Sequence, residues 1–161
     1  MAQETPQFSI AEIVELAVQI EKNGRGFYNL LADKSKEKKA SEIFKHLAEE
    51  EGRHIEDVKA IRESTVIYEP YESYPQEYFA YMNALAAEHV FTKEGTGEDK
   101  AKEITTDKEA IDVGLGFEKI SILFYEGMKR LFSGNDIKII NKLIDQEKNH
   151  VTHLWELRSM L

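Results

Sequence analysis

Two Glu-x-x-His pairs, each inside an apolar helical repeat, restrict what this chain of 161 residues can fold into. The pairs are Glu51 with His54 and Glu147 with His150. Apolar residues precede and follow each pair at steps of three and four, so the acid and the imidazole share the buried face of a helix. Because burying either group alone would be costly, the pattern requires partner groups in the same core.

Two further apolar repeats each place one glutamate, Glu21 or Glu118, on the buried face. The four predicted buried faces are Val14, Ala17, Glu21, Gly24, Tyr28 and Leu31; Ala40, Phe44, Leu47, Glu51, His54, Val58 and Ile61; Ile111, Gly114, Glu118, Ser121, Tyr125, Met128 and Phe132; and Ile140, Leu143, Glu147, His150, Leu154 and Leu157. The sequence thus predicts an all-α protein with four core helices that carry four inward glutamates and two inward histidines.

The two halves of the chain repeat one another. The pattern of residues 21–28 recurs at 118–125 with an offset of 97, and that of 47–58 recurs at 143–154 with an offset of 96. One deletion in a turn reconciles the two offsets. Each half is therefore predicted to be a helical hairpin, and two hairpins related by pseudo-twofold symmetry would form the bundle.

The hairpins are expected at about 9–63 and 107–160. Their ends are marked by capping boxes at 9–12 and 106–109, a polar turn at 33–36, and a glycine stop with an N-cap, Asn135, at 133–135. Gly24 and Gly26 fall inside the first helix. They predict either a kink or the close approach of a neighbouring helix or small molecule.

Residues 67–106 form a long connection between the hairpins. Its first part is rich in proline and tyrosine, residues 76–91 have a helical pattern, and the glycines of 95–97 are expected to end that helix. A connection of this length usually crosses the whole bundle, which makes the second and third core helices parallel. Glu88 and His89 are expected to be solvent-exposed, because no spacing ties them to the core.

Composition excludes several classes of function. The net charge of −9 argues against nucleic acid as a partner, and no apolar run approaches the ~20 residues that span a membrane. The N-terminus shows no signal peptide, so a cytoplasmic location is expected. With no cysteine, the chain cannot form disulfides or iron–sulfur clusters, so any metal must be held by oxygen and nitrogen. The length suggests one domain over residues 1–161.

The inward polar groups suit a two-metal site. The candidate metal ligands are Glu21, Glu51, His54, Glu118, Glu147 and His150. Four carboxylates would neutralise two divalent ions, and oxygen and nitrogen ligands suit iron or manganese in a redox role, although zinc would also bind. A bundle in which these groups only hydrogen-bond one another is the alternative without metal.

Tyr28 and Tyr125 lie two helical turns after Glu21 and Glu118 on the same faces. Each could donate a hydrogen bond to a ligand carboxylate on a facing helix and so orient it. The alternative is a core aromatic residue whose hydroxyl reaches any nearby acceptor.

At these residues the chain resembles the ferritin-like di-iron carboxylate proteins. Their pattern is one Glu from each of two helices and Glu-x-x-His from each of the other two. Within that superfamily it is most similar to the di-iron domain of rubrerythrin, without the rubredoxin module. The resemblance implies a ferritin-like four-helix bundle, two iron ions, and often the reduction of hydrogen peroxide. The chain departs from rubrerythrin at Ser121, where an additional carboxylate is common, and at His150, which replaces the matching carboxylate.

The leading functional hypothesis is a di-iron oxidoreductase that reduces hydrogen peroxide or O₂. An external electron carrier such as a rubredoxin is expected, since the chain has neither cysteines for a rubredoxin-type iron nor a G-x-G-x-x-G sequence for a nicotinamide or flavin. A ferroxidase or iron-handling protein and a module with a structural metal are the alternatives. A homodimer is expected, with hairpin exchange as one arrangement.

Overall fold

The computed structural model describes residues 10–64 and 76–161, and all regular structure within them is helical. The elements are α1 (Ile10–Lys34), α2 (Lys38–Ser64), α3 (Gln76–Glu88), η2 (Val90–Thr92), α4 (Thr96–Glu103), α5 (Asp107–Met128), η3 (Lys129–Leu131) and α6 (Asn135–Met160). This confirms the predicted all-α class. The predicted cap at Ser9 and the proline- and tyrosine-rich stretch that ends at Pro75 lie outside the described residues.

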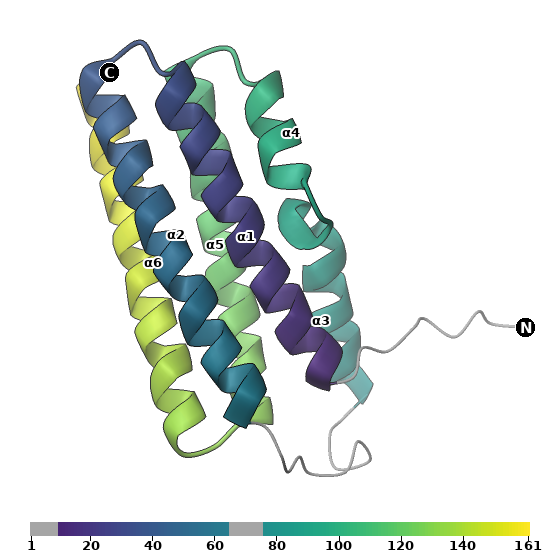
Figure 1. Ribbon diagram of the computed structural model, residues 1–161. Helices are drawn as coiled ribbons and strands as arrows, with labels where there is room; N and C mark the ends of the chain where they lie inside the picture. Colours follow the sequence, from purple (N-terminus) through teal and green to yellow (C-terminus); the bar gives the residue numbers. More distant parts are fainter. Residues whose placement is uncertain (1–9, 65–75) are drawn as a thin grey trace, which may run out of the picture.

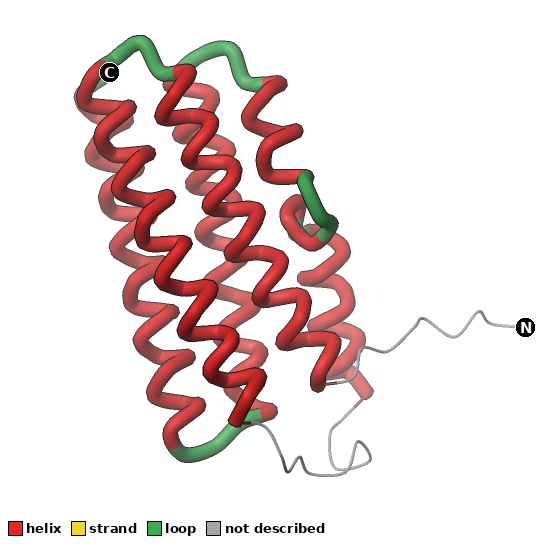
Figure 2. The backbone as a smooth tube through the Cα atoms, viewed as in Figure 1, coloured by secondary structure: helices red, strands yellow, loops and turns green. Residues whose placement is uncertain are grey.

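Helices α1, α2, α5 and α6 form a four-helix bundle (Figure 1). The hairpin α1–α2 turns at one end of the bundle, and the hairpin α5–α6 turns at the other. Figure 2 shows that only short loops interrupt the helices among the described residues. Helices α2 and α5 run in the same direction, and the crossover returns along the side of the bundle with α3 against α5 and α4 against α1, which confirms the predicted crossover (Figure 1).

The crossover is attached to α1 by hydrogen bonds from side chains of that helix. Asn23 Nδ2 donates to the carbonyl oxygens of Phe91 and Lys93, both at 2.7 Å, and Asn23 Oδ1 accepts from the Gly97 N–H. Lys34 Nζ reaches the carbonyl oxygen of Ile104 at 2.7 Å, near the other end of the crossover. These bonds satisfy the buried amide of Asn23 and hold the crossover in a defined register along α1.

The crossover contains a second α-helix that the sequence analysis missed. Gly95, Thr96 and Gly97 were expected to end a helix, but Gly95 instead precedes the first turn of α4, with φ 79°. Glycine adopts this left-handed conformation without steric cost. A Cβ atom at Gly97 would overlap the backbone carbonyl of Asn23, so this glycine permits close packing of α4 on α1. Gly95 therefore allows α4 to begin, and Gly97 allows its first turn to pack on α1, where the sequence predicted a helix end.

Helix α1 runs without a break through Gly24 and Gly26, so the predicted kink is wrong and close approach is the correct interpretation. A Cβ atom at Gly24 would lie 2.9 Å from Phe117 Cζ and 3.1 Å from Glu51 Oε2. At Gly26 the nearest atom would be Glu98 Cγ of α4, at 3.1 Å. The two glycines thus admit side chains from three neighbouring elements.

The predicted N-terminal cap is right for α5 and wrong for α6. Thr106 caps α5, with its Oγ1 accepting from the Glu109 N–H at 3.1 Å. For α6 the N-cap is Gly134 rather than Asn135, and no side chain caps it. Gly134 has φ 60° and ψ −129°, a conformation that favours glycine, so the chain turns one residue earlier than expected.

The four predicted buried faces form the core, and Phe132 alone among them is only half-buried. Aromatic rings crowd one side of it, where Phe91 and Phe117 pack with ring centroids 4.5 Å apart. Within residues 10–64 and 76–161, no helix has both the length and the apolar composition needed to cross a membrane.

Candidate metal centre

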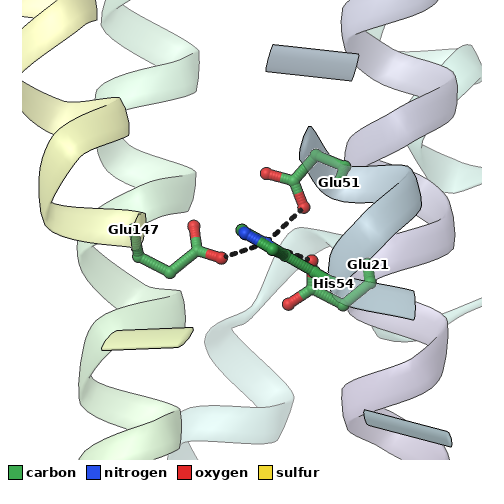
Figure 3. Close-up of side chains that lie close together, drawn as sticks. All are labelled: Glu21, Glu51, His54 and Glu147. Atoms are coloured by element: carbon green, nitrogen blue, oxygen red, sulfur yellow. Dashed lines mark hydrogen bonds and ion pairs between the residues drawn. The ribbon is translucent and has the colours of Figure 1, made fainter. Parts of the chain in front are cut away.

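All four bundle helices contribute a glutamate to one buried cluster, and α2 and α6 each add a histidine. The cluster consists of Glu21 from α1, Glu51 and His54 from α2, Glu118 from α5, and Glu147 and His150 from α6. Each of these side chains is at most 1% exposed. Figure 3 shows four of them converging from α1, α2 and α6. The structure therefore brings together every candidate ligand that the sequence suggested.

The cluster divides into two overlapping groups, each with ligand atoms within 4.8 Å of one another. One group contains Glu21 and His54, and the other contains Glu118 and His150. Glu51 and Glu147 belong to both groups. Because Glu51 and Glu147 belong to both groups, each of these two carboxylates is placed to bind two ions at once.

Both imidazoles point Nδ1 into the cluster. His54 Nδ1 lies 2.9 Å from Glu147 Oε1 and 3.3 Å from Glu21 Oε2. His150 Nδ1 lies 3.2 Å from Glu51 Oε1 and 3.3 Å from Glu118 Oε1. The two rings are nearly parallel, with centroids 5.3 Å apart. Each ring thus offers the same nitrogen to its own group of carboxylates.

The four carboxyl groups do not share one charge state. Burial, followed by the charge of a neighbouring glutamate, raises the pKa of Glu21 and of Glu118 well above the ordinary value. Burial acts in the same direction on Glu147, but close contacts with Glu118 and the two imidazoles outweigh it and hold the pKa of Glu147 well below that value. Burial and the charge of Glu147 would raise the pKa of Glu51, but similar close contacts, led by that with Glu21, lower it. Glu21 and Glu118 therefore favour the acid form, whereas Glu51 and Glu147 favour the carboxylate.

The imidazoles complete the charge balance. Burial alone would lower the pKa of both histidines, but the carboxyl groups around them, first Glu21 for His54 and Glu118 for His150, raise both pKa values. Two imidazolium ions then offset two carboxylates, so protons keep the cluster close to neutral. Two divalent ions bound by four carboxylates would achieve the same neutrality without those protons.

The hydrogen bonding of the cluster is incomplete, which is the observation that tests whether metal ions fit. Buried polar atoms without a hydrogen-bond partner include both carboxylate oxygens of Glu51, both of Glu147, Glu118 Oε2 and His150 Nδ1. Buried polar atoms are normally paired, and unpaired ones require an explanation. Converging unpaired oxygen and nitrogen atoms fit two divalent cations with oxygen and nitrogen ligands.

Two tyrosines connect the hairpins at this cluster. Tyr28 of α1 donates to Glu118 Oε1 at 2.5 Å, and Tyr125 of α5 donates to Glu21 Oε1. Each tyrosine therefore holds the glutamate of the opposite hairpin, in the way the sequence analysis considered for a ligand carboxylate. Burial, then the neighbouring glutamates, raise the pKa of both phenols, so both remain donors at neutral pH.

The pattern that defines the rubrerythrin family matches residues 12–157, which include the whole cluster. The chain belongs to the rubrerythrin family. Among solved structures, it is similar to a protein from Thermotoga maritima described as a candidate ferritin-like diiron-carboxylate protein. The TM-score is 0.69 and the sequence identity 21%, over 97% of this chain and 98% of the other, which shows a ferritin-like fold. No curated protein sequence is significantly similar to the chain.

In this rubrerythrin-family chain, His89 contradicts the prediction that it is solvent-exposed. It is only 2% exposed, whereas Glu88 beside it is exposed as predicted. His89 Nδ1 accepts from the Phe91 N–H at 3.2 Å, which leaves Nε2 to donate to Ser121 Oγ at 3.0 Å. Its ring packs edge-on against Phe117. The chain bends between α3 and η2, and this bend turns His89 inward, which helical spacing could not indicate.

Glu50 is a second residue that the sequence analysis did not single out. Its Oε2 accepts a hydrogen bond from His150 Nε2 at 2.7 Å, on the side of the ring that faces away from the cluster. That hydrogen bond lowers the pKa of Glu50 to about 2. A carboxylate on the outer nitrogen of a metal-binding histidine orients the ring and increases its basicity. The available signal was its position immediately before Glu51.

Proposed function

We propose that this chain is a non-haem di-iron oxidoreductase that reduces hydrogen peroxide or O₂ with electrons from an external donor. The observation that supports it most is the pair of overlapping buried groups with unpaired oxygen and nitrogen atoms. Family membership supports the same proposal. Ligands without a thiolate suit iron or manganese in a redox role, and iron is the proposed metal.

The proposed ligands follow from the two groups. Glu21 and His54 would hold one ion and Glu118 and His150 the other, while Glu51 and Glu147 would bind both. Two ferrous ions at this position would supply the two electrons that reduce one molecule of hydrogen peroxide, with two protons, to two molecules of water.

Side chains next to the cluster orient its carboxylates and pack around it. The hydroxyls of Tyr28 and Tyr125 donate to Glu118 and Glu21, the glutamates that belong to only one group each, and limit the movement of their carboxylates. Ser121 is buried one turn after Glu118, and its oxygen already accepts from His89. The Ser121 hydroxyl proton is therefore oriented away from His89. The aromatic side chains around Phe117 exclude bulk water from the same side.

The electron donor is proposed to be a separate protein. The chain contains no cysteine and therefore cannot hold a rubredoxin-type iron. A rubredoxin or another small electron carrier would dock within electron-transfer distance of the cluster. A homodimer, with or without exchange of a helical hairpin, is part of the same proposal because the two halves are complementary.

The proposal is tested with protein purified natively without oxygen. Elemental analysis should find two irons per chain, and hydrogen peroxide should change the absorption of the ferrous protein. NADH should be oxidised steadily when peroxide, a rubredoxin and its reductase are all present. Steady NADH oxidation without a carrier would refute the external donor. A single oxidation of ferrous iron, with no turnover for any carrier, would favour the ferroxidase function instead.

A further inference from the structure

The two halves of the bundle differ at one pair of matched positions beside the ligand set. Glu50 immediately precedes Glu51, and Gln146 immediately precedes Glu147. The repeat offset of 96 residues relates these two positions to each other, as it relates the two Glu-x-x-His pairs. Both side chains are half-buried. One half of the bundle thus has a carboxylate where the other has an amide of nearly the same shape.

The carboxylate is engaged with a ligand histidine of the opposite hairpin. Glu50 Oε2 accepts from His150 Nε2 at 2.7 Å. Glu50 Oε1 lies 3.6 Å from Arg53 Nη2 and 3.6 Å from His46 Nε2, both on α2. With Nδ1 of His150 facing the cluster and Nε2 bonded to Glu50, both nitrogens of this ring have defined roles.

The matched histidine lacks this support. His54 also points Nδ1 into the cluster, but its Nε2 is buried and has no hydrogen-bond partner. The side-chain oxygen of Gln146 is likewise buried without a partner. An amide oxygen can accept the hydrogen bond from His54 Nε2 in the same way, but it carries no net charge.

The ligand sets themselves do not distinguish the two positions. Each group contains three glutamates and one histidine, and a tyrosine from the opposite hairpin holds the unshared glutamate of each. Ser121 and Gly24 also occupy matched positions and differ, but neither is charged. The charge next to the outer nitrogen of the histidine is therefore an electrostatic difference between the two groups.

We infer that Glu50 makes the position held by His150 and Glu118 the tighter of two metal positions, so that it fills first, while Gln146 leaves the position held by His54 weaker. The inference rests on the two-metal site proposed above. A carboxylate partner increases the basicity of a metal-binding imidazole, and changes of such partners alter metal affinity by about 10- to 100-fold. The chain therefore binds its two ions in sequence rather than as an equivalent pair.

The test is an anaerobic titration of chelator-stripped protein with Co²⁺, followed by the visible absorption of the bound ion and by competition with a chelator. The natural chain should bind two equivalents in two resolved steps, with affinities that differ about 10- to 100-fold. Glu50→Gln should weaken the first step, and Gln146→Glu should strengthen the second. Either substitution should bring the two affinities together.

Single-site variants assign the steps to positions. His54→Ala should keep the tight step, whereas His150→Ala should lose it and keep the weak one. Glu49→Gln and Asn149→Asp make the same changes of net charge at exposed positions on the same two helices, and should leave both affinities unchanged. Circular dichroism of each variant checks that it is folded, and Gln146→Glu tests the inference even if Glu50→Gln fails to fold.

Two equal affinities in the natural chain would overturn the inference and leave the two-metal site intact. An unchanged gap between the steps in folded Glu50→Gln or in Gln146→Glu would overturn it as well. Loss of the tight step in His54→Ala would show that the order is reversed. A natural chain that binds no Co²⁺, Fe²⁺ or Mn²⁺ would instead refute the proposed function itself.

Discussion

The buried imidazole of His89 should make the stability of the protein depend on pH in a defined window. Burial lowers the pKa of His89 from 6.5 to about 4, although the charges of Glu147 and Glu51 oppose that shift. The unfolded chain therefore takes up a proton as the pH falls below about 6.5, while the folded chain does not until about pH 4. The contribution of neutral His89 to the unfolding free energy is complete above pH 6.5 and is lost progressively as the pH falls to 4.

The size of the effect follows from the two pKa values. A difference from 6.5 to about 4, at 1.36 kcal/mol for each pH unit, corresponds to about 3 kcal/mol of unfolding free energy. At pH 7, replacing His89 removes either the bond from the Phe91 N–H or the bond to Ser121, and also the ring contact with Phe117. Each lost hydrogen bond costs about 1 kcal/mol.

The assay is urea unfolding of chelator-treated protein between pH 4 and pH 7, for the natural chain, His89→Gln and His89→Asn. The Gln amide can replace the donor to Ser121, whereas the Asn oxygen can replace the acceptor for Phe91. Both variants should be less stable than the natural chain at pH 7 by about 1–2 kcal/mol. Neither side chain titrates, so both should lose about 3 kcal/mol less on acidification to pH 4, and the order of stability should reverse between about pH 5 and pH 6.

Because the two variants break different hydrogen bonds, a shared change of pH profile isolates the proton of His89. Parallel profiles for all three proteins would refute the reasoning. A His89 ring resonance that titrates with a midpoint near 6.5 in the folded protein would refute it independently.

Three further predictions concern the metal cluster and the crossover. Glu51→Ala or Glu147→Ala removes a carboxylate that both groups share, so elemental analysis should find one metal ion or none, and two ions in either variant would contradict the assignment. Binding of two divalent ions near pH 7 should release about four protons, two from carboxylic acids and two from imidazolium ions. Calorimetry in buffers of different ionisation enthalpy measures this number, and fewer than two would count against the charge assignment. Gly97→Ala should destabilise the protein by about 2–4 kcal/mol, because the new methyl overlaps the Asn23 carbonyl. Gly116→Ala, in open space on α5, should be neutral or stabilising in the same unfolding assay.

Repeating helical spacing explains why so much of the cluster could be predicted. Glu51 and His54 are three residues apart on one helix, so their shared face follows from helix geometry alone. The same helical spacing predicts that Glu21 and Glu118 are buried, and the internal repeat predicts that the two hairpins form one bundle. The length of the connection was sufficient for the parallel arrangement of α2 and α5.

Contacts between distant segments account for what the sequence analysis missed. His89 is buried because the bend after α3 turns it towards Ser121, 32 residues later. The start of α4 after Gly95 depends on packing against Asn23. The side-chain amide of Asn23 donates a hydrogen bond to the carbonyl oxygen of Phe91, 68 residues away, and accepts one from the Gly97 N–H. Glycines in a sequence mark permitted conformations, but the partner segment determines whether a helix ends or begins there.

The sequence by itself determined the all-α class, the two hairpins and the six inward ligand candidates, because each depends on spacing within a single helix. Only the tertiary structure decided which ligand candidates belong to both groups and that the two histidines differ in their outer partners. Glu51 and Glu147 join both groups because α2 and α6 face one another, and Glu50 reaches His150 across that same contact. Relations between helices depend on how their faces are packed together, which the periodicity of one helix does not contain.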